Sequence, residues 1–237
     1  EEVEKLPEVP EIKSGQALAK VVINDDKAGW ADSVKTLMES LYDGQNIYFD
    51  YSEIRLEGAR LKTMGGRASG PQPLVKLHDF IRETMHNSQG RKLTTLEAHD
   101  ICNQIAEIVV VGGVRRSSQI SLSDLDDKEM RHAKEWPFPI KRAMANNSAI
   151  YREKPSAGQF LKEWAELALS GTGERGIFNL QAAQSKAPSR RYAPLIQGTN
   201  PCGEIMLRDM EFCNLSEVVV RAEDDLDTLL DKVETAA

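Results

Sequence analysis

The sequence is poor in cysteine, in long apolar runs and in positive charge, and each shortage excludes a class of protein. Only three cysteines occur among 237 residues, Cys102, Cys202 and Cys213, which is too few for a disulfide framework. No stretch is long and uncharged enough to span a membrane, and no signal segment stands at the start. These absences predict a soluble, cytoplasmic protein in a reducing compartment.

The shortage of basic residues bears on the partners. Lys and Arg number 30 against 37 Asp and Glu, so the formal net charge is −7, whereas a phosphate-tracking surface normally carries a basic excess. Nucleic acid is therefore not expected as a partner, although local arginine clusters still allow small anions. The hydrophobic fraction of 41% is that of an ordered globular protein.

Familiar cofactor and metal motifs are missing as well. The sequence contains no Walker motif, no GxGxxG, no CxxC and no short His/Cys spacing of the kind that binds zinc. No metal site is therefore predicted, and the usual nucleotide fingerprints give no guidance.

The alternation of strand-type and helix-type patterns predicts an α/β protein built largely of parallel crossover units. Residues 1–24 are expected to form an extended lead-in that ends in a first strand at residues 17–24. Further strands are expected at residues 46–51, 114–122, 142–151, 176–179 and 214–221. Helices are expected around Leu74, Leu77, Ile81 and Met85, and at residues 31–42, 94–111, 157–170 and 226–235.

Two helix details follow from the same patterns. Thr94 and Glu97 have the spacing of a capping box, and Ser123 is expected to cap a short charged helix. Apolar residues recur at helical spacing in the segment 157–170, which predicts one buried face. The residues expected on that inward face are Phe160, Leu161, Trp164, Leu167 and Ala168.

The stretch that could carry chemistry is GTNPCGEI at residues 198–205. If it is extended, Asn200, Cys202 and Glu204 share one face, because side chains two apart point the same way. Pro201 cannot donate to a strand ladder, which favours an exposed edge or a loop. A loop that holds the three side chains towards a cavity fits best.

Cys202 by itself leaves several roles open. A cysteine acts as a nucleophile, a metal ligand, a disulfide partner or a one-electron centre. None of the four histidines stands in a recognisable catalytic motif, and the step of eleven residues from Cys202 to Cys213 does not match zinc spacing. A pair of buried, unreactive cysteines is the default for isolated thiols, and packing explains Cys102 within its apolar-striped helix.

Several segments together resemble a known family. NPCGEI at residues 200–205 is followed by CNL at residues 213–215, and four earlier motifs stand in the family's order. They are YSEIR at 51–55 with GGRASGP at 65–71, GGVRRS at 112–117, ANNSA at 145–149 and GERGIFN at 173–179. From about residue 25 to its end, the chain resembles the class II, adenosylcobalamin-dependent ribonucleotide reductases, and most of all the ribonucleoside-triphosphate reductases.

The resemblance implies a fold. The family's catalytic domain is a ten-stranded α/β barrel, of the type shared with glycyl-radical enzymes, with a finger loop that carries the catalytic cysteine. Residues 25–237 are expected to be a central part of that barrel, incomplete at both ends, because ten strand–helix units need on the order of 300 residues.

The resemblance also implies a reaction, the thiyl-radical reduction of ribonucleotides, expected to be triphosphates, to 2′-deoxyribonucleotides for DNA synthesis. Adenosylcobalamin would be the cofactor and a thioredoxin-type protein the reductant. Cys202 would carry the thiyl radical that takes the 3′ hydrogen of the ribose, Glu204 would be the general base at the 3′ hydroxyl, and Asn200 would orient the substrate hydroxyls. Cys213 would be one of two reducing thiols, and the sequence offers no matching second one.

Two loops would, by the same resemblance, respond to a deoxynucleotide effector. The residues expected to bind it are Arg55, Lys62, Gly65, Gly66, Arg67, Ser69 and Gly70. The residues expected in a specificity loop are Gly112, Gly113, Arg115, Arg116 and Ser117. An ordinary strand-to-helix turn and a solvated arginine pair are the alternatives. Other functions left open are a nucleotide-binding module without turnover, a diphosphate-specific reductase and a thiol–disulfide protein.

Overall fold

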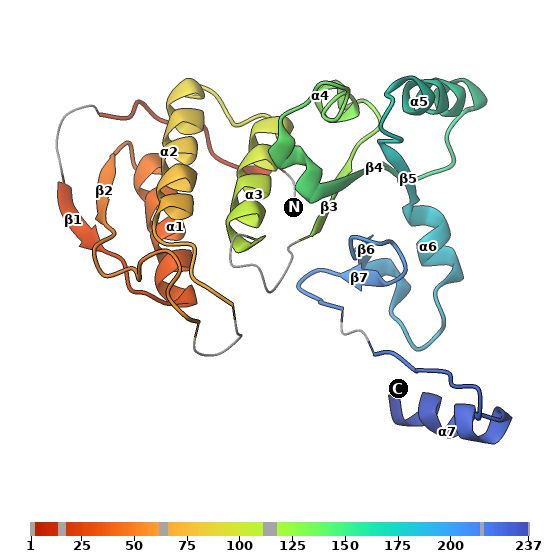
Figure 1. Cartoon of the computed structure of the whole chain (residues 1–237). Coiled ribbons are helices and arrows are strands. Elements are labelled where there is room, and N and C mark those ends of the chain that lie inside the picture. The colour runs from red at the N-terminus through yellow and green to blue at the C-terminus, as the bar shows by residue number, and fades with distance from the viewer. Residues whose placement is uncertain (1–2, 14–17, 62–65, 111–117, 214–215, 237) are drawn as a thin grey trace. The chain divides into compact units, whose positions relative to one another are not determined.

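The computed structural model describes residues 3–13, 18–61, 66–110, 118–213 and 216–236 of the chain (Figure 1). The chain divides into two compact units, Glu1–Gln181 and Ala182–Ala237. Among the described residues, no helix combines the length and the apolar character needed to cross a membrane.

Helices and strands alternate through most of the first unit. The helices of the chain are α1 (Lys27–Tyr42), α2 (Gln72–Asn87), α3 (Thr95–Val110), α4 (Lys128–Arg131), α5 (Ala157–Leu169), α6 (Leu180–Lys186) and α7 (Leu226–Ala236). The strands are β1 (Leu18–Val22), β2 (Ile47–Asp50), β3 (Gln119–Ser123), β4 (Ala145–Tyr151), β5 (Gly176–Asn179), β6 (Ile196–Thr199) and β7 (Met206–Arg208). Short 3-10 turns lie at Val3–Lys5, Ile140–Met144 and Ala193–Leu195.

The sheets confirm the prediction of an α/β protein with parallel strands. β1 pairs in parallel with β2, and β3, β4 and β5 form a second parallel sheet in that order. β6 and β7 form an antiparallel pair. Within the part of the chain that the structure describes, the sheets do not close into a barrel.

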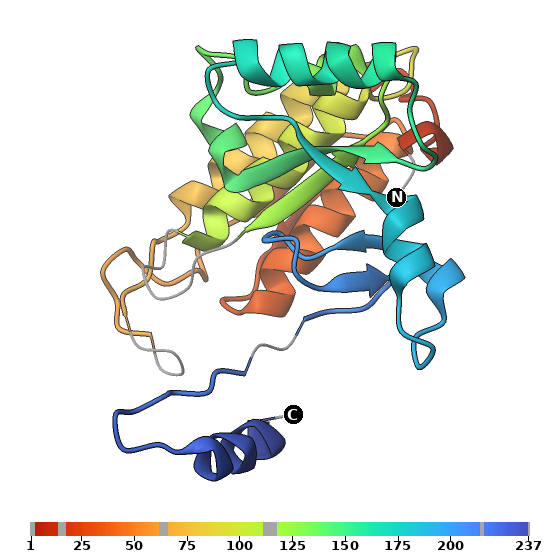
Figure 2. The same cartoon turned by 90° about the vertical axis from the view of Figure 1, so that its right-hand side faces the viewer.

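The main core lies between α1, α2 and the sheet β1–β2. The predicted stripe of α2 is fully buried, since Leu74, Leu77, Ile81 and Met85 are each 0% exposed. Burial of one such side chain contributes about 1.5–3 kcal/mol, so this face alone accounts for much of the local stability. α2 and α3 lie side by side, and α3 lies against β3 (Figure 2).

The lead-in belongs to this core. Val9 and Ile12 are 1% and 4% exposed, and the Val9 backbone bonds to Arg91 O at 2.9 Å and to Gly90 N at 2.9 Å. Ile12 N donates to Gln89 Oε1 at 2.6 Å. The expected extended lead-in is therefore held against the turn that follows α2.

Helix starts follow side-chain capping. The predicted box at α3 is present, because Thr94 N donates to Glu97 Oε2 at 2.9 Å and Glu97 N donates to Thr94 Oγ1 at 3.2 Å. The predicted cap of α4 is wrong. Asp127 caps this helix by accepting from Met130 N at 2.9 Å, whereas Ser123 is the last residue of β3.

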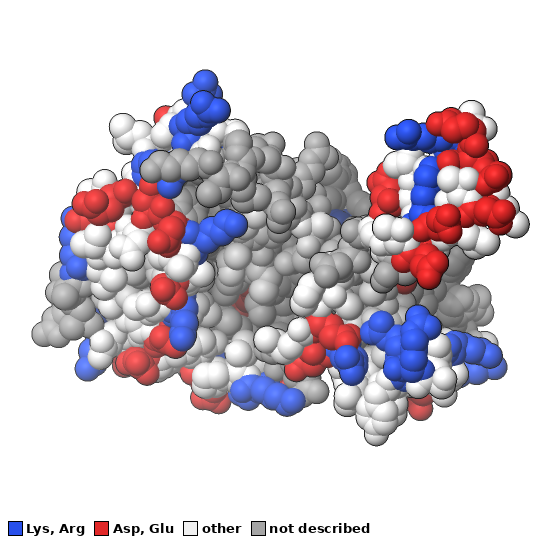
Figure 3. Space-filling model, turned by 90° about the horizontal axis from the view of Figure 1, so that it is seen from below, with Lys and Arg blue, Asp and Glu red and all other residues white. Residues whose placement is uncertain are grey.

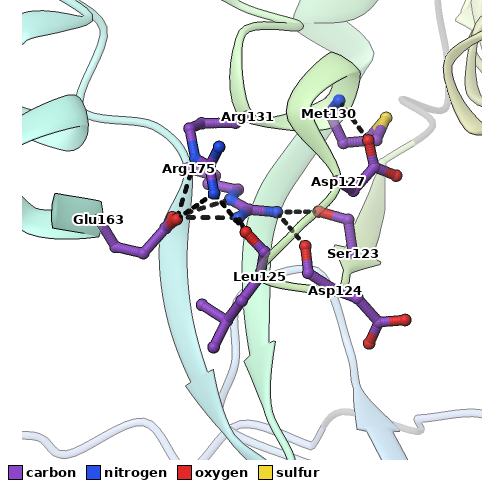
Figure 4. A network of polar contacts seen from close by, with 8 residues as sticks. All are labelled: Ser123, Asp124, Leu125, Asp127, Met130, Arg131, Glu163 and Arg175. Atoms are coloured by element: carbon purple, nitrogen blue, oxygen red, sulfur yellow. Dashed lines mark hydrogen bonds and ion pairs between the residues drawn. The ribbon is translucent and has the colours of Figure 1, made fainter. Parts of the chain in front are cut away.

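The inward face predicted for α5 is also wrong. Phe160, Leu161 and Trp164 are 38%, 64% and 54% exposed, whereas Glu163 is 8% exposed. The Glu163 carboxylate lies between the guanidinium groups of Arg131 and Arg175 (Figure 4). A buried arginine requires a carboxylate partner, and this requirement turns the charged side of the helix inward.

Arg175 ties this charged cluster to the sheet. Its Nη1 donates to Ser123 Oγ at 2.8 Å and to Asp124 O at 2.7 Å, and its Nη2 donates to Leu125 O at 2.9 Å (Figure 4). The guanidinium is 2% exposed, so these bonds replace the water that it loses. The end of β3, the start of β5 and helix α5 are thereby held at one point.

The second unit is built around the β6–β7 hairpin, which the strand patterns did not predict. The strand expected at 214–221 is absent over residues 216–221, which have no regular structure and are followed by a turn at residues 222–223. Helix α7 follows as expected, with exposed acidic side chains at Asp227, Asp231 and Glu234, and Figure 3 shows that acidic groups predominate in this part of the chain.

Candidate functional site

Residues 200–205 form a tight turn between β6 and β7. Asn200 N donates to Ile205 O at 3.1 Å, and Gly203 N donates to Asn200 O at 3.0 Å. Gly203 has a φ of 89°, a left-handed conformation that glycine adopts without strain. The segment is therefore a loop, as Pro201 favoured, and not the extended strand on which a shared face would depend.

Asn200 organises this turn. It is 3% exposed, and its Oδ1 accepts from Ile205 N at 3.1 Å and from Thr199 Oγ1 at 3.3 Å. Its Nδ2 donates to Glu204 Oε1 at 2.7 Å and lies 4.0 Å from Cys213 Sγ. One amide thus closes the turn with its oxygen and orients a carboxylate and a thiol with its nitrogen.

The three cysteines differ in their surroundings. Cys202 is exposed near the tip of the turn, and Cys213 is half-buried beside Asn200. Cys102, which was expected to be a packing residue, is instead exposed on α3. The structure therefore brings together Asn200, Glu204 and Cys213, with Cys202 in the same turn and open to solvent.

The Glu211 carboxylate forms salt bridges that hold β7, the strand that follows the turn. Glu211 accepts from Arg208 Nε at 2.6 Å and from Arg191 Nη2 at 3.1 Å. The Arg208 guanidinium holds the pKa of the Glu211 carboxyl below its usual value. Arg191 also donates to Met206 O at 2.8 Å, so the residues before and after the hairpin are joined.

The loop predicted to bind an effector is closed by its own backbone. Gly58 N donates to Ala68 O at 2.9 Å, Ala68 N donates to Ala59 O at 2.7 Å, and Leu61 N donates to Gly66 O at 3.1 Å. These amides are already used inside the loop. Of the three, only Ala68 N belongs to the stretch 65–71 that was predicted to approach an anion, so that one amide is already used.

The charged residues of that loop have protein partners too. Arg55 Nε pairs with Asp25 Oδ2 at 2.6 Å, and Arg67 Nη1 donates to Gly58 O at 2.9 Å. Ser69 Oγ donates to Gly70 O at 3.4 Å, and Gly66 and Gly70 have φ values of 82° and 71°. Lys62 and Gly65 lie outside the described residues.

The predicted specificity loop lies wholly outside the described residues, which covers Gly112, Gly113, Arg115, Arg116 and Ser117. Both neighbouring elements, α3 and β3, are described, and polar side chains join them. His99 Nδ1 contacts Ser121 Oγ at 2.7 Å, and Gln119 Nε2 donates to Asn103 Oδ1 at 2.7 Å. The sequence patterns missed these residues, although His99 and Asn103 stand four apart and therefore on one face of the helix.

A second buried histidine was missed in the same way. His78 is 0% exposed, with Tyr51 Oη 2.7 Å from its Nδ1 and Ser33 Oγ 3.1 Å from its Nε2. Ser33 already donates to Trp30 O at 2.7 Å, so it accepts from His78 Nε2–H, and Tyr51 donates to Nδ1. Burial lowers the pKa of His78 to about 3, with Arg82 adding to the effect, so the ring is neutral.

Metal and cofactor binding depend on different features of the chain. Among the described residues, no three His, Cys, Asp or Glu side chains gather closely enough to hold a metal ion. The tip of the 200–205 turn is open, because a Cβ added at Gly203 would meet nothing within 4 Å. An exposed thiol beside open space leaves room for a large organic group to approach Cys202.

Two family models match the chain. "B12-dependent ribonucleotide reductase, insertion domain" matches residues 9–85, and "Ribonucleotide reductase, barrel domain" matches residues 114–236. The second model covers more than half of the chain and contains the 200–205 turn. The first overlaps residues that were expected, as part of 25–237, to belong to the barrel.

Known proteins are similar over most of the chain. An adenosylcobalamin-dependent ribonucleoside-triphosphate reductase of Lactobacillus helveticus (strain DPC 4571) is 33% identical over 87% of this chain, and one of Euglena gracilis is 33% identical over 88%. The chain spans 29% of the length of each. A crystal structure of a B12-dependent (class II) ribonucleotide reductase has a TM-score of 0.68 and 29% identity, covering 80% of this chain and 27% of that one.

Proposed function

Because the chain belongs to the ribonucleotide reductase family, we propose that it is the part of a class II enzyme that carries the radical cysteine. The whole protein would reduce ribonucleoside triphosphates to 2′-deoxyribonucleotides for DNA synthesis. The observation that carries the proposal is the 200–205 turn, where Asn200 Nδ2 lies 2.7 Å from Glu204 Oε1 and 4.0 Å from Cys213 Sγ. An amide, a carboxylate and a thiol meet beside the exposed Cys202.

Cys202 would start the reaction. Adenosylcobalamin would supply, when bound, the one-electron oxidising equivalent that removes a hydrogen atom from a thiol. The exposed Cys202 sulfur and the open space at Gly203 fit a large group at this tip. The Cys202 sulfur, as a thiyl, then takes the 3′ hydrogen atom of the ribose.

Glu204 and Asn200 would handle the substrate hydroxyls. The Glu204 carboxylate accepts the proton of the 3′ hydroxyl, which favours departure of the 2′ hydroxyl as water once a reducing thiol has given that hydroxyl a proton. Asn200 Nδ2 holds that carboxylate through the bond of 2.7 Å, so the base is oriented before the substrate arrives. Asn200 in this way couples the shape of the turn to the position of the base.

Cys213 would supply reducing electrons. Together with a second thiol it loses two hydrogens and forms a disulfide: one leaves as a proton with the 2′ hydroxyl, which becomes water, and the other ends at the 2′ carbon. Cys202 returns to the 3′ carbon the hydrogen atom that it took, and is a thiyl again. A thioredoxin-type protein would reduce the disulfide again by thiol–disulfide exchange. This chemistry needs free thiols at rest, which fits a reducing, cytoplasmic setting.

The remaining parts follow from the same proposal. Residues 25–237 would belong to a catalytic chain organised around a ten-stranded α/β barrel, with the 200–205 turn as its finger loop. Arg55 and the loop at residues 62–70 would receive a deoxynucleotide effector, and residues 112–117 would adjust substrate choice. Since Arg55 is paired with Asp25 at 2.6 Å, an anionic effector would have to compete with that carboxylate.

Substitution of Cys202 in the full-length protein tests the proposal. Cys202→Ser is expected to abolish reduction of ribonucleoside triphosphates in the presence of adenosylcobalamin and a dithiol, because serine forms no comparable radical. Cys102→Ser is the matched control, since it removes an exposed thiol outside the turn and is expected to keep turnover. Turnover by Cys202→Ser at the rate of the Cys102→Ser protein would refute the assignment.

A further inference from the structure

The chain reverses its direction both before and after β7. β7 leads away from the 200–205 turn, yet Cys213, which follows this strand, lies beside that turn, with its Sγ 4.0 Å from Asn200 Nδ2. A second reversal must therefore stand between β7 and Cys213. It is a turn from Arg208 to Glu211, closed by a bond of 3.3 Å from Glu211 N to Arg208 O. This segment is called the return turn below.

The return turn contains a strained residue. Met210 has a φ of 59°, in the left-handed region that is disfavoured for a residue with a side chain and is usually taken by glycine or asparagine. Burial does not offset this strain, because the Met210 side chain is 90% exposed. A residue in such a conformation persists only where the surrounding structure holds it. The return turn therefore depends on contacts made by the neighbours of Met210.

The Glu211 carboxylate supplies those contacts. Its Oε2 accepts from Arg208 N at 2.7 Å and its Oε1 accepts from Arg208 Nε at 2.6 Å, so both oxygens bind the first residue of the return turn. Arg191 Nη2 donates to Glu211 Oε2 at 3.1 Å and to Met206 O at 2.8 Å. Because one nitrogen reaches both oxygens, the Glu211 carboxylate lies alongside the start of β7. The chain has thus turned back towards the 200–205 turn.

A carboxylate is suited to this role because, when ionised, it only accepts hydrogen bonds. Each of its oxygens has room for two donors, and bonds from a guanidinium are stronger than bonds between neutral groups. Hydrogen bonding from Arg208 holds the pKa of Glu211 below its usual value, so this group is ionised near pH 7. A neutral amide in its place would offer one oxygen and would turn its own hydrogens towards one of the donors. The return turn would then lose part of its support.

We propose that Glu211 is a positioning residue that places Cys213 for the delivery of reducing electrons. Glu211 holds the return turn, and the return turn brings the Cys213 thiol back beside Asn200. This inference rests on the proposed function, in which Cys213 gives up hydrogen to the substrate. Glu211 acts through the backbone that joins it to the thiol. Electron delivery therefore depends on a contact outside the 200–205 turn.

Three substitutions in the return turn separate its conformation from its charge. Glu211→Gln keeps the size of the side chain but removes one acceptor oxygen and the negative charge. Asp209→Asn is the matched control, because it makes the same change of charge in the same turn at an exposed carboxylate. Met210→Gly removes the strain, since glycine adopts a φ of 59° without it. Combined with Glu211→Gln, Met210→Gly should therefore restore the return turn without restoring the charge.

Alkylation of Cys213 measures its placement without turnover. The reduced full-length protein is treated with iodoacetamide, and mass spectrometry gives the alkylation rate of Cys213 relative to Cys102, which lies on α3. Glu211→Gln should raise this relative rate about five-fold, the factor for one lost hydrogen bond, because the half-buried Cys213 thiol is released. Asp209→Asn should leave the relative rate unchanged. Addition of Met210→Gly to Glu211→Gln should return it to the wild-type value.

Steady-state kinetics of the full-length enzyme give the functional readout. Glu211→Gln should lower kcat on a ribonucleoside triphosphate by about tenfold, because a displacement of about 1 Å in a reacting group can cost as much as a hundredfold in rate. KM should stay within about twofold of the wild type, since Cys213 acts on the substrate only after it has bound. Asp209→Asn should keep kcat, and Met210→Gly should recover it in the Glu211→Gln protein.

The outcomes are distinguishable. A wild-type alkylation rate or a wild-type kcat in Glu211→Gln would overturn the positioning role. An equal change in Asp209→Asn, or no recovery with Met210→Gly, would overturn it as well, because the effect would then come from charge and not from the return turn. If the wild-type enzyme reduces no ribonucleotide, the proposed function fails by itself. The alkylation rates, which need no substrate, then decide whether Glu211 places Cys213.

Discussion

Replacement of Glu163 by glutamine is expected to loosen helix α5. The Glu163 carboxylate is 8% exposed and accepts from Arg131 Nε at 2.9 Å and from Arg175 Nη2 at 3.0 Å. Glutamine keeps the shape but offers one oxygen, and its amide hydrogens would point at guanidinium hydrogens. Two buried cations would then face each other without a carboxylate between them.

The size of the effect follows from this burial. Removal of one partner from a buried ion pair costs about 3–5 kcal/mol, since the other charge stays buried and unpaired. A loss of about 3 kcal/mol in local stability corresponds to roughly a hundredfold faster amide exchange, because ~1.4 kcal/mol is a factor of ten. The acceleration should appear in α5 and in residues 123–131, which Arg131 and Arg175 hold.

Hydrogen–deuterium exchange of the full-length protein, followed by mass spectrometry of its peptides, measures this directly. Glu135→Gln is the control, because Glu135 pairs with His132 at 3.1 Å while it is 60% exposed. An exposed pair of this kind contributes about 0–1 kcal/mol, so its loss should leave exchange in α5 nearly unchanged. If Glu163→Gln exchanged within about threefold of the control, the buried triad would not be what holds α5.

Two further predictions concern other polar groups. Acid should destabilise the first unit through His78, whose pKa falls from 6.5 to about 3 on folding. As the pH falls from about 6.5 towards 3, His78 binds a proton in the unfolded chain but not in the folded one. The free energy of unfolding should therefore decrease by ~1.4 kcal/mol per pH unit from this group. Urea midpoints against pH should show this contribution, and His78→Gln should lower the slope by ~1.4 kcal/mol per pH unit, while His99, whose pKa burial lowers to about 4, keeps a contribution of its own; an unchanged slope would show that His78 is not the group responsible. In the hairpin, Asn200→Asp keeps an oxygen for Ile205 N but sets a second carboxylate against Glu204, so turnover of the full-length enzyme should fall by about tenfold or more while the turn persists. Turnover at the wild-type level would remove Asn200 from the positioning of Glu204.

Hydrophobic periodicity was sufficient to predict the buried face of a helix where that helix packs against a single apolar core. The stripe of α2 and the capping box of α3 were predictable because the spacing of Leu74 to Met85, and of Thr94 to Glu97, depends only on helix geometry. The same spacing failed for α5. Amphipathic pattern shows which side is apolar, but only the buried Arg131 and Arg175 show which side must turn inward.

The candidate site shows the same division between local and non-local causes. The tendency of residues 200–205 to form a loop was readable from Pro201, which cannot donate to a strand ladder. The convergence of Asn200 and Glu204 was predicted from strand alternation, yet it arises from a chain reversal closed by the Asn200 side chain. Burial of His78 and His99 depends on strands distant in sequence, which no local pattern reports.

The hydrogen bonds of the lead-in limit how far this protein can be truncated at its N-terminal side. Val9 and Ile12 are bound to the turn after α2, and Lys13 N donates to Gly44 O at 3.1 Å in the turn after α1. The lead-in thus connects the turn after α1 with the turn after α2. A protein that started at β1 would lack Val9 N and Ile12 N, the donors that Arg91 O and Gln89 Oε1 bind. The domain boundary for expression therefore lies before Val9.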